Sequence, residues 1–302
     1  MHRVSIAVVA AISSIAFAHT ASAADLPRKA PAAPPSVYTW TGFYLGANAG
    51  YGWLNNETAQ LFPSSGTGNL FTFPAIAPPA PTPQVSTISF SGNGGFGGLQ
   101  AGYNYQVRSN WLVGVETDLQ AASIKGSGNG TIKTVFSDPF FGLPDWATAA
   151  STKIRWFGTT RARIGFLPTD NLLLYATGGI AYGQVERTAS LSSTFNPPGS
   201  TSSGGFVCAN GTVCFQETER HTQTGWAAGV GGELAFWRGA PMNMRLKVEY
   251  LHVDLGGRIL SVPATQPPGP ATMIAGYSAA RFDVVRIGLN VPLGNPAVVA
   301  RP

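Results

Sequence analysis

The residues of this chain that could carry out catalysis are few. Beyond the N-terminal region there are two histidines, His221 and His252, and Asp254 lies close to the second. A histidine next to a carboxylate could activate a loop serine to attack a lipid. However, no G-x-S-x-G segment or other spaced nucleophile motif accompanies these residues. We therefore predict that the chain has no catalytic residues and is not an enzyme.

One short motif resembles a cofactor-binding site, but the segments around it do not support that function. Residues 92–97 read GNGGFG and match the G-x-G-x-x-G pattern of dinucleotide sites. That pattern works between a strand and a helix, whose N-terminus meets the pyrophosphate. Here an alternating strand pattern follows, so we expect a glycine-rich loop or bulge, and no cofactor.

The cysteines Cys208 and Cys214 lie in a stretch rich in Gly and Ser. In an oxidising compartment we expect them to form a disulfide that closes a small loop, and two free thiols are the alternative. A redox pair or a metal site is less favoured, because only His221 is near in sequence. We predict no metal site.

The elements that must position all other side chains are strands. Residues 40–53 alternate between apolar residues on one face and glycine or polar residues on the other, with a tryptophan at each end. Such a strand suits the wall of a membrane β-barrel, which is apolar outside and polar inside. Seven further segments read as strands: 97–107, 110–122, 152–166, 172–185, 222–236, 244–253 and 281–293. The facing of 172–185 is ambiguous, and a bulge is possible there.

Short and long connections alternate along the chain. Residues 108–110, 167–171 and 237–243 are short, whereas 54–96, 123–151, 186–221 and 254–280 are long and rich in Gly, Pro, Ser and Thr. Outer-membrane barrels show this alternation. The sequence therefore predicts an all-β fold: an eight-stranded antiparallel up-and-down transmembrane β-barrel with short periplasmic turns and long extracellular loops.

Charged residues alternate with the apolar ones on the predicted inner face. Eight strands leave an interior just wide enough for side chains to fill. Buried charges must be paired, so we predict a lumen charge network that plugs the barrel. The alternative is a thin water path with a mild preference for anions, since bases outnumber acids in the predicted set: Glu116, Asp118, Lys153, Arg155, Arg161, Arg163, Glu233, Arg245, Lys247, Glu249 and Arg286.

Tryptophans fall near both ends of the predicted strands. The tryptophan ring is apolar in body and has one polar N–H, so it favours membrane interfaces. We predict a lower belt of Trp40, Trp111 and Trp237 and an upper belt of Trp53, Trp156 and Trp226. The alternative is that the chain forms a soluble β-sandwich and that these tryptophans cover the edges of its sheets.

Composition and the N-terminus indicate export. Charged residues make up 11% of the chain, against roughly 25% in soluble domains. The basic residues are scattered, so we expect no nucleic-acid partner. We predict a signal peptide at 1–23, a Pro-rich periplasmic leader at 24–36, the barrel at 37–294 and a C-terminal tail at 295–302.

Several segments resemble one family. Residues 23–27 (AADLP) and 40–46 (WTGFYLG), together with 175–183, 225–233, 247–251 and 282–290, are similar to the porin-like outer-membrane immunogenic proteins of alphaproteobacteria, which are themselves similar to the OmpA-like barrel. The resemblance implies a Gram-negative outer-membrane location, surface exposure and a role in envelope integrity. The family usually ends its last strand with an aromatic residue that the barrel-assembly machinery recognises, and Leu293 is the nearest residue here.

The leading hypothesis is an outer-membrane barrel with a structural, envelope-integrity and surface-interaction role. A passive porin for small solutes is the alternative, and a soluble periplasmic ligand-binding barrel is the second. As partners we expect outer-membrane lipid and lipopolysaccharide and the barrel-assembly machinery, with any surface ligand unidentified.

Overall fold

The computed structural model describes residues 38–63, 85–132, 146–193, 212–239, 242–265 and 272–294. These residues form strands and short connections. The strands are β1 (Gly42–Pro63), β2 (Ser86–Arg108), β3 (Trp111–Ile132), β4 (Trp146–Thr169), β5 (Leu172–Ser193), β6 (Val213–Gly239), β7 (Met242–Asp254), β8 (Arg258–Pro263), β9 (Thr272–Tyr277) and β10 (Arg281–Leu293).

Antiparallel pairing closes eight of the ten strands into a ring. Strands β1 to β7 pair in sequence order, β7 pairs with β10, and β10 pairs with β1. The predicted fold class is therefore confirmed. None of the described elements is a helix that is long and apolar enough to cross a membrane.

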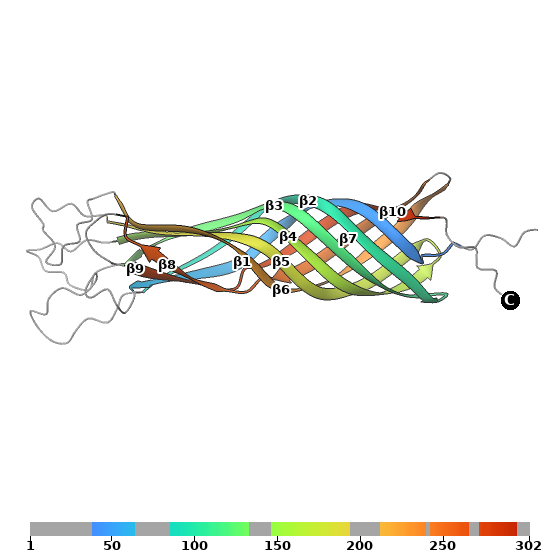
Figure 1. Cartoon of the computed structure of the whole chain (residues 1–302), viewed down its shortest axis with the longest axis horizontal. Coiled ribbons are helices and arrows are strands. Elements are labelled where there is room, and N and C mark those ends of the chain that lie inside the picture. The colour runs from blue at the N-terminus through green and yellow to red at the C-terminus, as the bar shows by residue number, and fades with distance from the viewer. Residues whose placement is uncertain are drawn as a thin grey trace, which may run out of the picture.

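The barrel has two tiers (Figure 1). In the turn-end tier, which carries the short connections 109–110 and 170–171, β7 and β10 complete the ring. In the loop-end tier those two strands have ended, and the β8–β9 hairpin takes their place. Strand β9 pairs there with the end of β1, and Ala264, just after β8, forms a bridge with Phe215 of β6.

Most strands are longer than the sequence predicts. Strand β1 continues to Pro63 instead of ending at Trp53, and β4 begins at Trp146, which we placed in a loop. The loop-end tier is built from segments that lack clear alternation of polar and apolar residues. They form strands because the neighbouring strands provide hydrogen-bond partners along their whole length.

β-Bulges at the junction of the tiers change which residues face inward. The register shifts between Leu54 and Glu57 on β1 and between Ile154 and Trp156 on β4. One extra residue on a strand moves every following side chain to the other face. The bulge considered possible at the start of β5 is not found: the side chains alternate there, with Leu173, Tyr175 and Thr177 inward.

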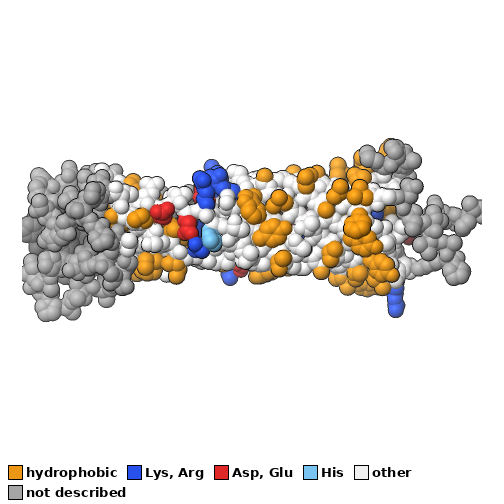
Figure 2. Space-filling view, viewed as in Figure 1, with side chains coloured by type: hydrophobic (Ala, Val, Ile, Leu, Met, Phe, Trp, Pro, Cys, Tyr) orange, Lys and Arg blue, Asp and Glu red, His pale blue; other side chains and the backbone are white. Residues whose placement is uncertain are grey.

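The outer wall of the turn-end tier is apolar, as predicted. Outward side chains include Phe43, Leu45, Leu99, Val113, Val115, Leu119, Ile164, Ile180, Val230, Val248, Ile287 and Leu289, all of them exposed. Figure 2 shows hydrophobic side chains over this half of the visible face and charged groups gathered beyond them, toward the loop end. This arrangement suits a wall that contacts hydrocarbon only along its turn-end half.

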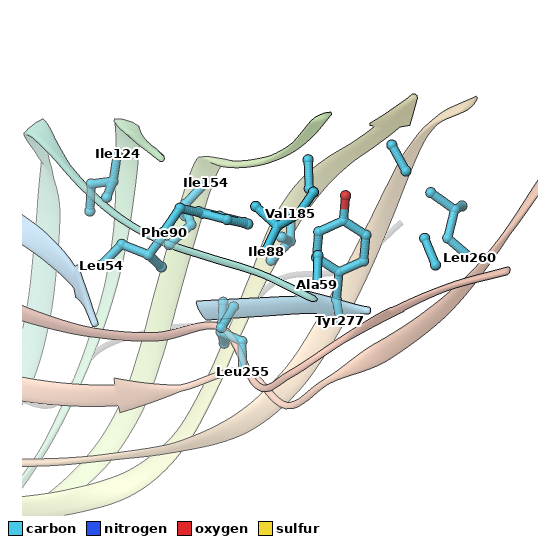
Figure 3. Packing of buried hydrophobic residues seen from close by; sticks show 14 of the residues in the cluster. Leu54, Ala59, Ile88, Phe90, Ile124, Ile154, Val185, Leu255, Leu260 and Tyr277 are labelled. Carbon is cyan, nitrogen blue, oxygen red and sulfur yellow. The ribbon is translucent and has the colours of Figure 1, made fainter. Parts of the chain in front are cut away.

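The interior differs between the tiers. Buried apolar residues from all sides of the loop-end tier pack against each other, as Leu54, Phe90, Val185, Leu260 and Tyr277 do in Figure 3. The turn-end tier instead encloses buried charged and polar side chains, with a smaller apolar cluster at its end around Trp40, Leu112 and Leu173.

Candidate functional site

The centre of the turn-end tier holds eight buried ionic groups. Four are bases, Arg161, Arg163, Lys247 and Arg286, and four are acids, Glu116, Asp118, Glu233 and Glu249. Their side chains come from β3, β4, β6, β7 and β10, so they converge from most of the ring. We call this set the lumen network.

Glu116 lies at the centre of the lumen network. Its carboxylate contacts Arg161 Nη2 at 2.8 Å, Arg286 Nη2 at 3.3 Å and Arg163 Nη1 at 3.5 Å, and it also contacts Lys247 Nζ. It accepts a hydrogen bond from the Tyr44 hydroxyl at 2.7 Å. Because each contact is buried, water screens these interactions little, and the loss of any one group removes part of the charge compensation of several partners at once.

The other three acids of the lumen network contact the same four bases. Asp118 contacts Arg161 at 3.1 Å and Arg286 at 3.0 Å. Glu249 contacts Arg161 at 3.2 Å and Lys247 at 3.4 Å, and it accepts a bond from Arg286 Nε at 2.6 Å. Glu233 contacts Arg163 at 2.6 Å. The bases and acids are thus equal in number.

Neutral polar residues that we did not predict complete the lumen network. Asn104 Oδ1 accepts bonds from Arg163 Nε at 2.9 Å and Nη2 at 2.6 Å. Tyr175 donates to Glu249 at 2.8 Å. Asn104 lay on the predicted inner face, so its position was available from the alternation. Tyr175 lay on the strand whose facing was ambiguous.

Glycines make room for the tyrosine rings in the lumen. A Cβ atom at Gly102 would lie 2.2 Å from the Tyr44 hydroxyl oxygen, and one at Gly231 would lie 2.5 Å from that of Tyr175. The small residues of the inner face therefore let each ring cross a neighbouring strand and reach an acid of the lumen network.

A layer of aromatic rings lies on the loop-end side of the lumen network. Phe157 packs edge-on against Phe96 and Phe282, with ring centroids 5.3 Å and 5.2 Å apart. All three side chains are buried and belong to the apolar cluster of the loop-end tier. Charged groups and phenyl rings thus occupy successive levels of the interior.

Two residues predicted for the lumen lie elsewhere, and for them the prediction is wrong. Lys153 and Arg155 point outward, whereas Ile154 between them is buried. The β4 bulge beside them is the reason, because it reverses the alternation that we extended from Arg161 and Arg163. Arg155 contacts Glu186 at 2.7 Å on the outer wall, and Arg220 contacts the same carboxylate at 2.6 Å.

Arg245 is buried on the inner face but does not join the lumen network. It lies closest to the turn end, where its guanidinium stacks 4.3 Å from the Trp40 ring and its Nε donates to the Tyr38 hydroxyl at 2.8 Å. Among the described residues, no carboxylate forms an ion pair with it.

Five of the six tryptophans predicted for the belts lie on the outer wall, and the sixth does not. Trp111 and Trp237 lie on the outer wall near the turn end, and Trp53, Trp156 and Trp226 lie on the wall near the tier junction. Trp40 is buried inside, where its Nε1 donates to the Asp170 carbonyl at 3.2 Å. The strand begins only at Gly42, whose φ of 136° lets the preceding segment turn under the barrel. Membrane contact by the five outer rings stays a prediction.

The acid that contacts His252 is not the one suggested by its position in the sequence. His252 Nδ1 lies 2.7 Å from Asp283, and Asp254 instead pairs with Arg281 at 2.8 Å. Within the described parts of the chain, no group of three or more His, Cys, Asp or Glu side chains is arranged so that it could hold a metal ion. Cys214 is disulfide-bonded, and Cys208 lies outside the described residues.

One further buried ion pair lies in the loop-end tier. Arg187 contacts Glu57 at 3.2 Å and Gln223 at 3.0 Å. It also donates to the carbonyls of Gly256 and Ser278, each at 3.4 Å. Those carbonyls lie where β7 gives way to β8 and where β9 gives way to β10, so one guanidinium ties together both breaks in the ring. We missed Arg187 in the sequence because it lies within residues 186–221, which we predicted to be a loop.

Comparison with known proteins agrees with this architecture. Residues 7–290 match the model of the outer membrane protein beta-barrel domain family. The chain is 33% identical over 290 residues to the 31 kDa outer-membrane immunogenic protein of Brucella melitensis, and the match covers 94% of this chain and 97% of that protein. The Brucella suis protein of the same description matches equally. The chain therefore belongs to the outer membrane protein β-barrel family, as its sequence motifs predict.

The solved structures that the chain matches are more distant. OprG from Pseudomonas aeruginosa has a TM-score of 0.39 and 13% identity, covering 84% of this chain and 97% of its own. The outer membrane protease OmpT from Escherichia coli has a TM-score of 0.38 and 10% identity, covering 83% and 97%. These likenesses carry no argument about function. The family assignment places the protein in the outer membrane. In such barrels the short turns face the periplasm, and we expect the same orientation of the turn end here.

Proposed function

We propose that this protein is a non-conducting, non-enzymatic structural barrel of the outer membrane whose loop-end tier projects beyond the lipid. The observation that supports it most is the balance of the lumen network, in which four bases face four acids. Each of the four acids contacts at least one base at ion-pair distance. A filled interior stiffens the wall and leaves little room for a solute.

The lumen network lacks the excess of bases on which the porin alternative depended. Lys153 and Arg155 lie outside, and Arg245 lies apart from the network. The aromatic layer of Phe96, Phe157 and Phe282 adds an apolar barrier that ions cross with difficulty. A soluble ligand-binding barrel does not suit the exposed aliphatic rows of the turn-end tier.

Planar-bilayer recording tests this proposal. The full-length protein, inserted and verified by its heat-shifted gel band, should produce no steady conductance steps in 1 M salt. The outer-wall variant Arg281→Gln serves as a control for insertion, because it leaves the interior unchanged. Regular conductance steps from the wild-type protein would support the porin instead.

We further propose that the protein is processed during export and that it has the partners expected from the sequence. Export would remove residues 1–23 and leave the leader 24–36 in the periplasm before the barrel 37–294 and the tail 295–302. The assembly machinery would insert the barrel, and phospholipid and lipopolysaccharide would surround its apolar band. Intact mass of the mature protein tests the cleavage, since a chain beginning at residue 1 would contradict it.

A further inference from the structure

Arg245 differs from every other arginine buried in the described interior. Arg161, Arg163, Arg187 and Arg286 each contact at least one carboxylate. Arg245 is only 2% exposed, yet its partners among the described residues are two aromatic rings and one hydroxyl. Burying an uncompensated charge is costly, so a retained buried guanidinium without an acid suggests a role in binding an anion.

The position of the guanidinium is fixed by its neighbours. The Trp40 ring lies 4.3 Å and the Tyr38 ring 5.6 Å from Cζ, and the Tyr38 hydroxyl accepts the Nε hydrogen. Cation–π contacts hold the plane of the group without neutralising its charge. Among the described residues, neither Nη group has a hydrogen-bond partner, which leaves one edge of the fork available for an oxyanion.

Arg245 also lines a cavity. It has a volume of about 130 Å³ and is lined by Arg245, Tyr38, Thr39, Thr41 and Asn243 together with residues of the strand ends. The lining contains no acid, and three of its side chains can donate hydrogen bonds through hydroxyl groups. The cavity therefore has the charge and the donors that a phosphate group needs.

The remaining lining is apolar and faces the membrane. Phe43 and Leu293 are directly opposed in the β1–β10 pairing, line the same cavity and are exposed on the outer wall. The cavity thus joins the apolar wall to a buried cation at the periplasmic rim. A free anion would need only the polar side, whereas a lipid headgroup with attached chains needs both.

We propose that this cavity, which we call the rim pocket, binds the phosphodiester headgroup of a phospholipid of the periplasmic leaflet. Arg245 forms two charge-assisted hydrogen bonds to the phosphate oxygens, Thr39 and Thr41 border the headgroup, and the acyl chains run along Phe43 and Leu293. The site goes beyond the structural role of the barrel, because it fixes an individual lipid at one point of the rim.

Titration of the detergent-solubilised full-length protein with dihexanoyl phosphatidylglycerol tests this site, with phosphorus NMR as the readout. Saturable binding of the lipid is expected, with much weaker binding of inorganic phosphate and acetate. Losing charge-assisted hydrogen bonds in Arg245→Gln should weaken lipid binding by about ten- to a hundredfold. Arg108→Gln is the matched control, since it removes a charge from an exposed position at the same rim and should change the affinity by less than about twofold.

A second variant keeps the test decisive if Arg245→Gln does not fold. Asn243→Asp places a carboxylate in the lining while retaining the arginine, and it should abolish lipid binding in a protein that still shows the heat-shifted band. Equal affinity of wild-type protein and Arg245→Gln for the lipid would overturn the proposal. Equal affinity of wild-type protein for lipid and inorganic phosphate would also overturn it, because the site would then bind free anions.

Discussion

Removing Glu116 should destabilise the barrel far more than removing an exposed acid. The Glu116→Ala variant leaves four buried bases facing three acids, and it removes contacts to all four bases at once. Breaking a buried pair by deleting one partner costs about 3–5 kcal/mol. Glu219→Ala is the control: Glu219 contacts Arg258, and about a third of each of these side chains is exposed, so the pair is expected to contribute only roughly 0–1 kcal/mol.

Urea unfolding of the protein in phospholipid vesicles measures both effects, with tryptophan fluorescence and the heat-shifted band as readouts. A double variant, Glu116→Ala with Lys247→Met, sharpens the test because it leaves three bases facing three acids. It should be more stable than Glu116→Ala alone, with a coupling energy of about 1–3 kcal/mol. The reasoning is wrong if Glu116→Ala and Glu219→Ala lower the free energy of unfolding equally, or if the double variant is the least stable.

Three further outcomes follow from particular contacts. Gly102→Val should push the Tyr44 ring away from its acid and make the barrel unfold at lower urea, whereas a stability within about 0.5 kcal/mol of wild type would contradict the close approach. Arg187→Met should expose the loop-end tier to proteolysis and leave the turn-end tier protected, and uniform protection would refute its role at the strand breaks. Hydrogen bonds from its two arginine partners lower the pKa of Glu186. Its ion pairs should therefore persist above the usual glutamate pKa and be lost only as pH falls through the lowered value, and carboxylate NMR shifts that move at pH 5 would contradict this.

The turn-end tier could be predicted from the sequence because the facing of its side chains follows from the residue pattern within each strand. Alternation with period two separates lipid-facing from interior side chains wherever the strand is regular, so Arg163, Lys247 and Val248 were assigned to the correct faces. The alternation fails across a bulge, and nothing in the residues around Ile154 signals the extra residue. The two charges beside it were therefore placed inside.

The loop-end tier could not be predicted because its strands depend on partners distant in sequence. Residues 54–63 and 272–277 carry too weak a pattern to be strands alone, yet residues 59–63 and 273–277 pair side by side as neighbouring antiparallel strands. The pairing of Arg187 with Glu57 depends on the same long-range closure. Likewise, Trp40 looked like a belt residue until the turn at Gly42 placed it inside.

The placement of lipid and water along the wall tests the account most directly. Spin labels introduced by Val248→Cys in the turn-end tier and Ser261→Cys in the loop-end tier can be compared by power saturation with oxygen and with a water-soluble nickel chelate. Both side chains are exposed on the wall. The label at 248 should relax with oxygen and the label at 261 with nickel. Nickel access at both positions would contradict a membrane-facing wall.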